Sequence, residues 1–175
     1  MFSKLLTFSG LVASTVALGI NCRGSGLCDL ATLENNSGMN ILQLWHDTLW
    51  STDLDAASTI YNDGDHVVCV GTNVGVTVSS SVSGNFGGAT GTIGLSSSAH
   101  LGTGGVCLFP QGASLNLGEI RDLVDALGEH GCATCGSVPI HFVDEGSNDP
   151  SSGILTSNYV SSPFCDGNCI THVGN

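Results

Sequence analysis

Eight cysteines constrain this chain more than any other feature of its sequence. All of them follow the first seventeen residues, and they are Cys22, Cys28, Cys69, Cys107, Cys132, Cys135, Cys165 and Cys169. An even number of cysteines in an exported chain of this size is typical of a disulfide framework, because the oxidising export route removes free thiols. Spacing alone leaves on the order of a hundred pairings open.

The start of the chain has the pattern of an export signal. Lys4 precedes a run of small and apolar residues from Leu5 to Ala17, which ends in an acceptable cleavage site before Leu18. This run is too short to cross a bilayer. We therefore expect residues 1–17 to be a signal peptide and residues 18–175 to form one secreted, extracellular domain.

The clearest predicted helix begins after Asn116 and ends near Gly131. Asn116 and Glu119 have the spacing of a capping box, and Gly131 is a natural stop. One face carries the apolar residues Leu117, Ile120, Leu123, Val124 and Leu127.

Two cysteines, Cys132 and Cys135, leave this helix together. They are placed to hold a distant segment, and the candidate is the other closely spaced pair, Cys22 and Cys28. A local bridge or a redox motif is the alternative for Cys132 and Cys135, but a signal peptide and the lack of a preceding βαβ pattern disfavour redox chemistry.

The rest of the chain predicts a second helix and several short strands. Residues 39–49 carry a helical apolar stripe that includes Trp45, with Trp50 just after it. We expect both tryptophans to pack in or near the core, with sugar stacking as the alternative. Residues 51–60 either extend this helix or begin a second one. The expected strands are residues 66–70, 74–79, 90–95, 106–110, 138–143 and 153–160.

A segment rich in glycine and serine, near residues 79–105, interrupts these strands as an insertion or a long hairpin. Helical stripes among short strands, without regular βαβ alternation, predict an α+β domain in which two helices pack on an antiparallel sheet.

The charge of the chain limits its partners. Without Lys4, Arg23 and Arg121 are the only lysine or arginine residues, against fifteen acidic residues. Such a surface repels nucleic acid and anionic lipid. It favours cationic surfaces, polyvalent cations or uncharged glycans, and we expect a monomer that is not an integral membrane protein.

No motif indicates a metal, a cofactor or catalysis. The acidic turn at Asn62–Asp65 lacks the ligand spacing of a calcium loop, and oxidation during export disfavours zinc at Cys132 and Cys135 despite His130 nearby. The sequence contains neither a Gly-x-Ser-x-Gly nor a His-Glu-x-x-His motif. We therefore expect no enzyme activity, no metal and no cofactor. A sequon predicts glycosylation at Asn35.

Four segments of the chain resemble the secreted killer toxins of the KP-four type, which come from a smut-fungus virus and from fungal genomes. The segments are residues 18–25, Val68-Cys69, residues 123–136 with their His-Gly-Cys-x-x-Cys-Gly core, and residues 155–160. The resemblance implies a small disulfide-stapled α/β sandwich. It also implies the disulfides Cys22–Cys132 and Cys28–Cys135. It further implies that Cys69 pairs with a tail cysteine, expected to be Cys165, which leaves Cys107 for Cys169; the assignment of the two tail cysteines stays open.

The resemblance also implies an activity, the inhibition of susceptible fungi by blocking calcium entry. In the family an exposed lysine two residues before the first-strand cysteine does much of this work, and that position here is Val67, beside His66. We take His66 and Val67 as the candidate target-binding residues. Because valine cannot replace a cation at an acidic pore, the scaffold transfers to this chain better than the channel mechanism does.

The leading hypothesis is a secreted toxin-like protein or effector that binds a target-cell surface protein or wall component without chemistry of its own. The alternative is a cell-wall glycan hydrolase that uses acid pairs such as Asp53/Asp55 or Asp144/Glu145. A glycan-binding wall protein built around the glycine- and serine-rich segment is the third hypothesis.

Overall fold

The computed structural model describes residues 19–28, 31–32, 40–86, 89–163 and 169–170. The predicted signal peptide and the Asn35 sequon lie outside these residues. None of the helices in the described ranges is long and apolar enough to cross a membrane.

Two helices form where the apolar stripes predict them. Helix α1 is Ile41–Ser51, and the side chain of its N-cap Asn40 accepts a hydrogen bond from the Gln43 amide. Helix α2 is Leu117–Glu129, and its capping box between Asn116 and Glu119 is formed in both directions. Helix α1 stops at Ser51, and the next regular element is strand β2, Ile60–Tyr61. The idea that residues 51–60 continue as helix is therefore wrong.

The main sheet is antiparallel and has five strands in the order β1-β3-β4-β7-β6. A second sheet pairs β2 with β5. The remaining strand bounds are Ala31–Thr32 for β1, Val68–Phe86 for β3, Ala89–Gln111 for β4, Leu115–Asn116 for β5, Gly136–Pro139 for β6 and Ile154–Val160 for β7, and a short 3₁₀ helix, η1, spans Pro150–Ser152.

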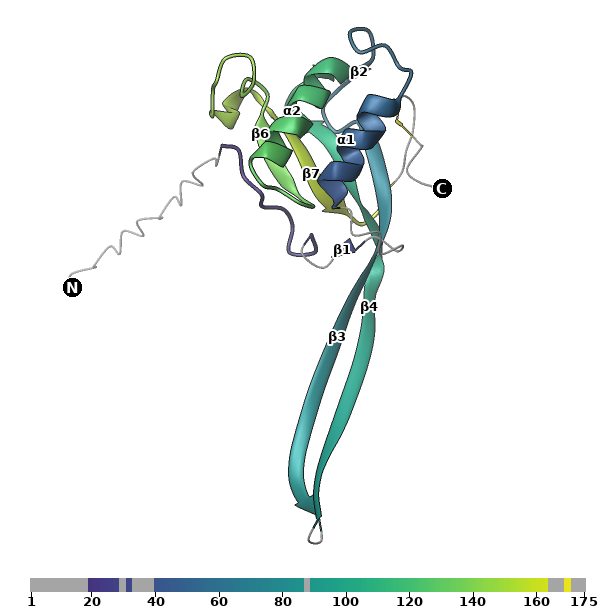
Figure 1. Cartoon of the computed structure of the whole chain (residues 1–175). Coiled ribbons are helices and arrows are strands. Elements are labelled where there is room, and N and C mark those ends of the chain that lie inside the picture. Colours follow the sequence, from purple (N-terminus) through teal and green to yellow (C-terminus); the bar gives the residue numbers. More distant parts are fainter. Residues whose placement is uncertain (1–18, 29–30, 33–39, 87–88, 164–168, 171–175) are drawn as a thin grey trace, which may run out of the picture.

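Four of the expected strands are in fact two long ones. Strands β3 and β4 pair from Val68/Leu108 out to Phe86/Ala89, with one register shift between Val74 and Gly75. The glycine- and serine-rich segment is thus a hairpin, which Figure 1 shows extending away from the rest of the molecule. Ladder hydrogen bonds carry the pairing through residues of low strand propensity.

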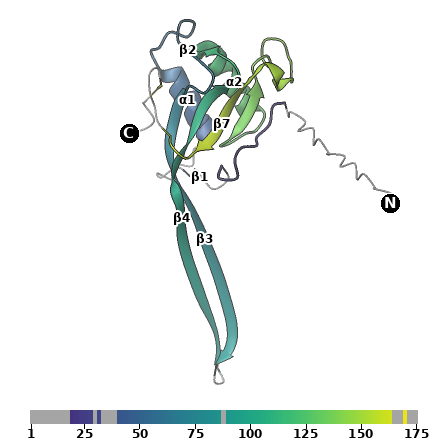
Figure 2. The same cartoon turned by 180° about the vertical axis from the view of Figure 1, so that it is seen from behind.

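The two helices lie side by side over one face of the main sheet (Figure 1), and the view from behind shows the sheet in front of them (Figure 2). The core between helices and sheet is apolar and contains, among others, Trp45, Leu49, Val68, Val106, Leu108, Ile120, Leu123, Leu127, Val138 and Leu155. These results confirm the predicted α+β fold with two helices on an antiparallel sheet.

The N-terminal segment is tied to the end of α2 by two disulfides. Cys22 is bonded to Cys132 and Cys28 to Cys135, with Cα–Cα distances of 4.9 and 6.0 Å. Asn21 and Ser137 also exchange two backbone hydrogen bonds of 2.9 Å. Both of these disulfides are the ones that the resemblance implied.

The expected pairing of Cys69 with Cys165 and of Cys107 with Cys169 is wrong. Cys69 is bonded to Cys107, with a Cα–Cα distance of 4.1 Å. The two residues are direct register partners on β3 and β4, a relation that only the strand pairing reveals. Cys169 is also disulfide-bonded, whereas Cys165 lies outside the described residues.

Candidate functional site

The two residues predicted to contact a target have different environments. Val67 is completely buried, and its amide donates a hydrogen bond of 2.8 Å to the Leu108 carbonyl. Its own carbonyl accepts from the Ile170 amide at 2.7 Å. Val67 is therefore a core residue, and its assignment as a target-binding residue is wrong.

His66 is partly exposed, and its ring lies 5.7 Å from the ring of Phe109, centroid to centroid. Ligand atoms of His66, Cys69 and Cys107 lie within 4.8 Å of one another. This grouping does not offer metal ligands, because both sulfur atoms belong to one disulfide and zinc requires thiolates. His66 packs at the edge of the core beside the first pair of the β3–β4 ladder.

The acidic turn before His66 uses its carboxylates to hold its own backbone. Asp65 Oδ2 accepts from the Asn62 amide at 2.7 Å, and Asp63 Oδ1 accepts from the Gly112 amide at 2.8 Å. Gly64 between them has a φ of 80°, the left-handed conformation that glycine adopts without strain. Asp63 and Asp65 therefore have a structural role in this turn.

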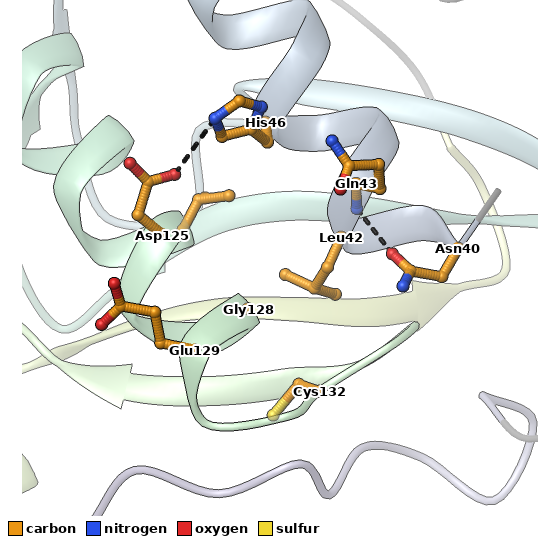
Figure 3. A pocket seen from close by; sticks show the side chains of 9 residues that line it. Asn40, Leu42, Gln43, His46, Asp125, Gly128, Glu129 and Cys132 are labelled. Carbon is orange, nitrogen blue, oxygen red and sulfur yellow. Dashed lines mark hydrogen bonds and ion pairs between the residues drawn. The ribbon is translucent and has the colours of Figure 1, made fainter.

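A pocket of about 290 Å³ lies between the two helices and was not predicted from the sequence. Leu42, Val124 and Cys132 line it together with the polar residues Asn40, Gln43, His46, Asp125 and Glu129, and with Gly128. Figure 3 shows His46 on α1 and Asp125 on α2 pointing toward each other, with Glu129 one turn further along. Asp125 and Glu129 share a helix face because they are four residues apart.

His46 links the carboxylates on both helices. Its Nε2 lies 3.7 Å from Asp125 Oδ1, and its Nδ1 lies 3.0 Å from Asp47 Oδ1. Asp125 Oδ1 is shielded from solvent, yet it accepts no hydrogen bond from any group in the described part of the chain. The Asp125 side chain as a whole is 37 % exposed, so a cationic group of a partner can reach the carboxylate from the pocket side.

The two arginines of the chain, Arg121 and Arg23, lie in different environments. Arg121 donates from Nε to the Leu49 carbonyl at 2.9 Å, and its guanidinium lies 5.1 Å from the centre of the exposed Trp50 ring. It therefore holds the C-terminal end of α1, where carbonyls lack partners within the helix. Arg23 is exposed, and its backbone amide donates to Asn21 Oδ1 at 3.0 Å.

Hydrogen bonding lowers the pKa of Asp47 below its ordinary value. The main cause is the hydrogen bond with His46, and a second one comes from Gln43 Nε2, 2.9 Å from Asp47 Oδ1. A carboxyl whose pKa is lowered by folding contributes stability at pH values above its unfolded pKa, and this contribution is lost as the pH falls through the folded pKa.

We expect the His46→Ala variant to raise the pKa of Asp47 toward its ordinary value, because the largest cause of the shift is then removed. An NMR titration of the Asp47 carboxyl carbon measures this. Asp149 is the internal control, because its pKa is lowered by hydrogen bonds from Ser151 that the substitution leaves in place. An unchanged Asp47 titration in the variant would contradict the assigned contact.

In the acid pairs considered for a hydrolase, Asp55 and Asp144 are exposed, and their pKa values are shifted in the direction opposite to that of a catalytic acid. The pKa of Asp55 is lowered by hydrogen bonds from Ser58, and that of Asp144 by a hydrogen bond with His141. A glycosidase acid needs a raised pKa so that it holds a proton at neutral pH. Ligand atoms of His141, Asp144 and Glu145 lie within 4.8 Å of one another, in an exposed loop.

The spacing of Asp125 and Glu129 in the predicted helix was the one sequence signal that pointed to part of this pocket. Asp125 and Glu129 occupy the polar side of the predicted helix, but their juxtaposition with His46 depends on how α1 packs against α2.

A family model described as Kp4 matches residues 5–161 of the chain. No curated protein matches it significantly.

Proposed function

The chain belongs to the Kp4 family, that of the Kp4 killer toxin, and from this premise we propose that it is a secreted toxin-like protein that binds the surface of a target cell without catalysing a reaction. The observation that carries this proposal is the family match over residues 5–161, which includes the N-terminal segment, both helices and the main sheet. The disulfides are consistent with an extracellular location.

The proposal includes growth inhibition of susceptible fungi, with calcium entry as the process to measure. The Val67 side chain has 0 % of its surface exposed. A channel therefore cannot contact this protein at the position that the lysine occupies in the family. We place the contact instead at the pocket between α1 and α2, where Asp125 and Glu129 suit a cationic group.

The first test is binding and growth inhibition by the purified protein on a panel of fungi, with and without added calcium. We expect saturable binding to susceptible cells and inhibition that added calcium relieves. Protein that neither binds nor inhibits any target across acidic and neutral pH would refute the proposed function. Release of sugars from isolated wall material, lost on substitution of one carboxylate, would establish the hydrolase alternative instead.

The second test locates the contact. We expect Asp125→Asn to weaken cell binding about ten-fold, because a hydrogen bond to a charged group is worth about 1.5 kcal/mol at the lower end of its range, which suits a partly exposed side chain. Asp122→Asn is the matched control, since it removes the same charge from an exposed position of the same helix outside the pocket. Equal binding by the two variants would exclude the pocket as the contact while leaving the toxin-like function open.

A further inference from the structure

The pocket between the two helices continues into a longer row of side chains along both of them. Residues four apart share a helix face, so His46 and Trp50 lie on one face of α1, and Arg121, Asp125 and Glu129 on one face of α2. Contacts join the two rows: Trp50 with Arg121, and His46 with Asp125. We call the following residues the α1–α2 seam: Asn40, Gln43, His46, Trp50, Arg121, Asp125 and Glu129.

One end of the seam is aromatic and open to solvent. Trp50 is 52 % exposed, although the Arg121 guanidinium lies over its ring. The centroid of the His46 ring is 6.2 Å from that of Trp50, and His46 also lines the pocket. The indole therefore adjoins the pocket. A flat, half-exposed indole next to polar groups suits a sugar ring, which has an apolar C–H face and polar edges.

The other end of the seam is polar and can bind hydroxyl groups. Asn40 Oδ1 accepts from the Gln43 amide at 2.6 Å, and Gln43 Nε2 donates to Asp47 at 2.9 Å. Within the described part of the chain, Asn40 Nδ2 and Gln43 Oε1 have no hydrogen-bond partner, which leaves one donor group and one acceptor for a ligand. A protein partner typically inserts an apolar anchor, whereas most residues that line this pocket are polar.

The charge of the seam selects a ligand with a cationic group. Asp125 and Glu129 both line the pocket, and the Asp125 side chain is 37 % exposed. Asp125 Oδ1 lies 3.7 Å from His46 Nε2, which is too far for a hydrogen bond. The chain has fifteen acidic residues and only three lysines and arginines, so it attracts a polymer of positive charges and repels an anionic one.

We propose that the α1–α2 seam binds an amino-sugar glycan, a polymer whose glucosamine units carry free, protonated amines. One sugar ring stacks on Trp50, and the amine of a neighbouring unit pairs with Asp125 or Glu129. From Asn40 to Trp50 the seam is about 15 Å long at about 1.5 Å per residue, enough for more than one sugar ring. The inference rests on the proposed function, because it names the class of partner for the contact placed at this pocket.

A divalent cation is a weaker candidate for the same carboxylates. A protein site for such an ion needs several ligand atoms close together. In the described ranges, two groups of three possible ligands lie within 4.8 Å of one another, His66 with two cysteines and His141 with two acids, and neither includes a residue of the seam. The spacing of the seam carboxylates therefore suits a larger ligand with amines of its own.

The experiment titrates the purified, disulfide-bonded protein with a glucosamine tetramer at about pH 6, where the carboxylates are ionised. The matched ligands are the tetramers of N-acetylglucosamine and of glucose, which lack the charge. The chain has two tryptophans, of which Trp45 is buried and Trp50 is exposed, so we expect ligand stacking to change the fluorescence of Trp50. We expect the glucosamine tetramer to bind about ten-fold more tightly than either uncharged tetramer.

Two pairs of variants, compared by calorimetry, locate the contacts. Trp50→Ala should weaken binding about ten-fold, whereas Trp50→Phe keeps an aromatic ring, so it should retain binding and lose the fluorescence change. Asp125→Asn should lower the preference for the glucosamine tetramer several-fold. Asp122→Asn removes the same charge from an exposed position outside the pocket and should leave that preference unchanged. Circular dichroism of each variant verifies that it is folded.

The outcomes separate this proposal from the proposed function. Equal affinity for the three tetramers, or unchanged binding by Trp50→Ala, would overturn the assignment of an amino-sugar glycan. Absence of tetramer binding, together with saturable cell binding that protease treatment of the cells removes, would also overturn it in favour of a protein partner. In that case the toxin-like function would stand, because the tetramers are tested without cells.

Discussion

A variant that lacks both bridges at the end of α2 is expected to lose about 7 kcal/mol of unfolding free energy, whereas loss of either bridge alone costs only about 3 kcal/mol. The reason is that the two disulfides close nearly the same loop. Cys22–Cys132 and Cys28–Cys135 span 110 and 107 residues. While one bridge remains, the other closes a ring of only about ten residues, so its own entropic contribution is small.

Urea unfolding of the variants Cys22→Ser/Cys132→Ser, Cys28→Ser/Cys135→Ser and the fourfold serine variant measures this coupling. A loss of about 7 kcal/mol is comparable with the whole stability of a small domain, so the fourfold variant should be largely unfolded at 37 °C. Losses that simply add would contradict the shared-loop argument.

The third described bridge is the control. Cys69 and Cys107 are 38 residues apart and already face each other in the β3–β4 ladder. Their removal should cost about 4 kcal/mol by the same loop argument. It should add to the loss from either single variant, because the small ring that each single variant opens does not contain residues 69–107.

Replacement of Trp45 by alanine is expected to cost about 4 kcal/mol. Its side chain is fully buried in the core between α1 and the sheet, and its indole N–H donates to Ser157 Oγ at 3.0 Å. Ser157 in turn donates to the Thr134 carbonyl at 2.8 Å, close to the second cysteine after α2. The substitution therefore leaves a large cavity and removes a donor from a buried hydroxyl.

Trp50 offers a matched control on the same helix. It is 52 % exposed and contacts Arg121, so Trp50→Ala should cost less than about 1 kcal/mol. Thermal and urea unfolding of the two variants, followed by circular dichroism, test the contrast. Similar losses at both positions would show that the burial of Trp45 does not determine its contribution.

The two tryptophans illustrate the limits of local patterns. Both belong to the same apolar segment of the sequence, and packing in or near the core was expected for both. Trp45 is in the core, but Trp50 lies at the end of α1 and is half exposed. A hydropathy pattern identifies the residues that favour burial, yet the packing of the helix against the rest of the fold decides which of them is covered.

The candidate site also shows the difference between what a local sequence pattern predicts and what tertiary packing decides. The resemblance to the killer toxins suggested a surface contact at Val67, but the structure places this residue inside the core. The pocket beside His46 was missed because Asp125 and Glu129 follow His46 by 79 and 83 positions in the chain. Residues so far apart in sequence are brought together only by packing.

By itself the sequence determined the two helices, the capping box of α2, the α+β class, and, through its likeness to killer toxins, the two bridges that fasten the N-terminal segment to the end of α2. These features depend on spacing within one element or on a short motif, which a linear pattern records. Only the tertiary structure decided the length of the β3–β4 hairpin, the Cys69–Cys107 bridge, the burial of Val67 and the acidic pocket. Each of these follows from cross-strand register or helix packing, which are set by contacts between distant residues.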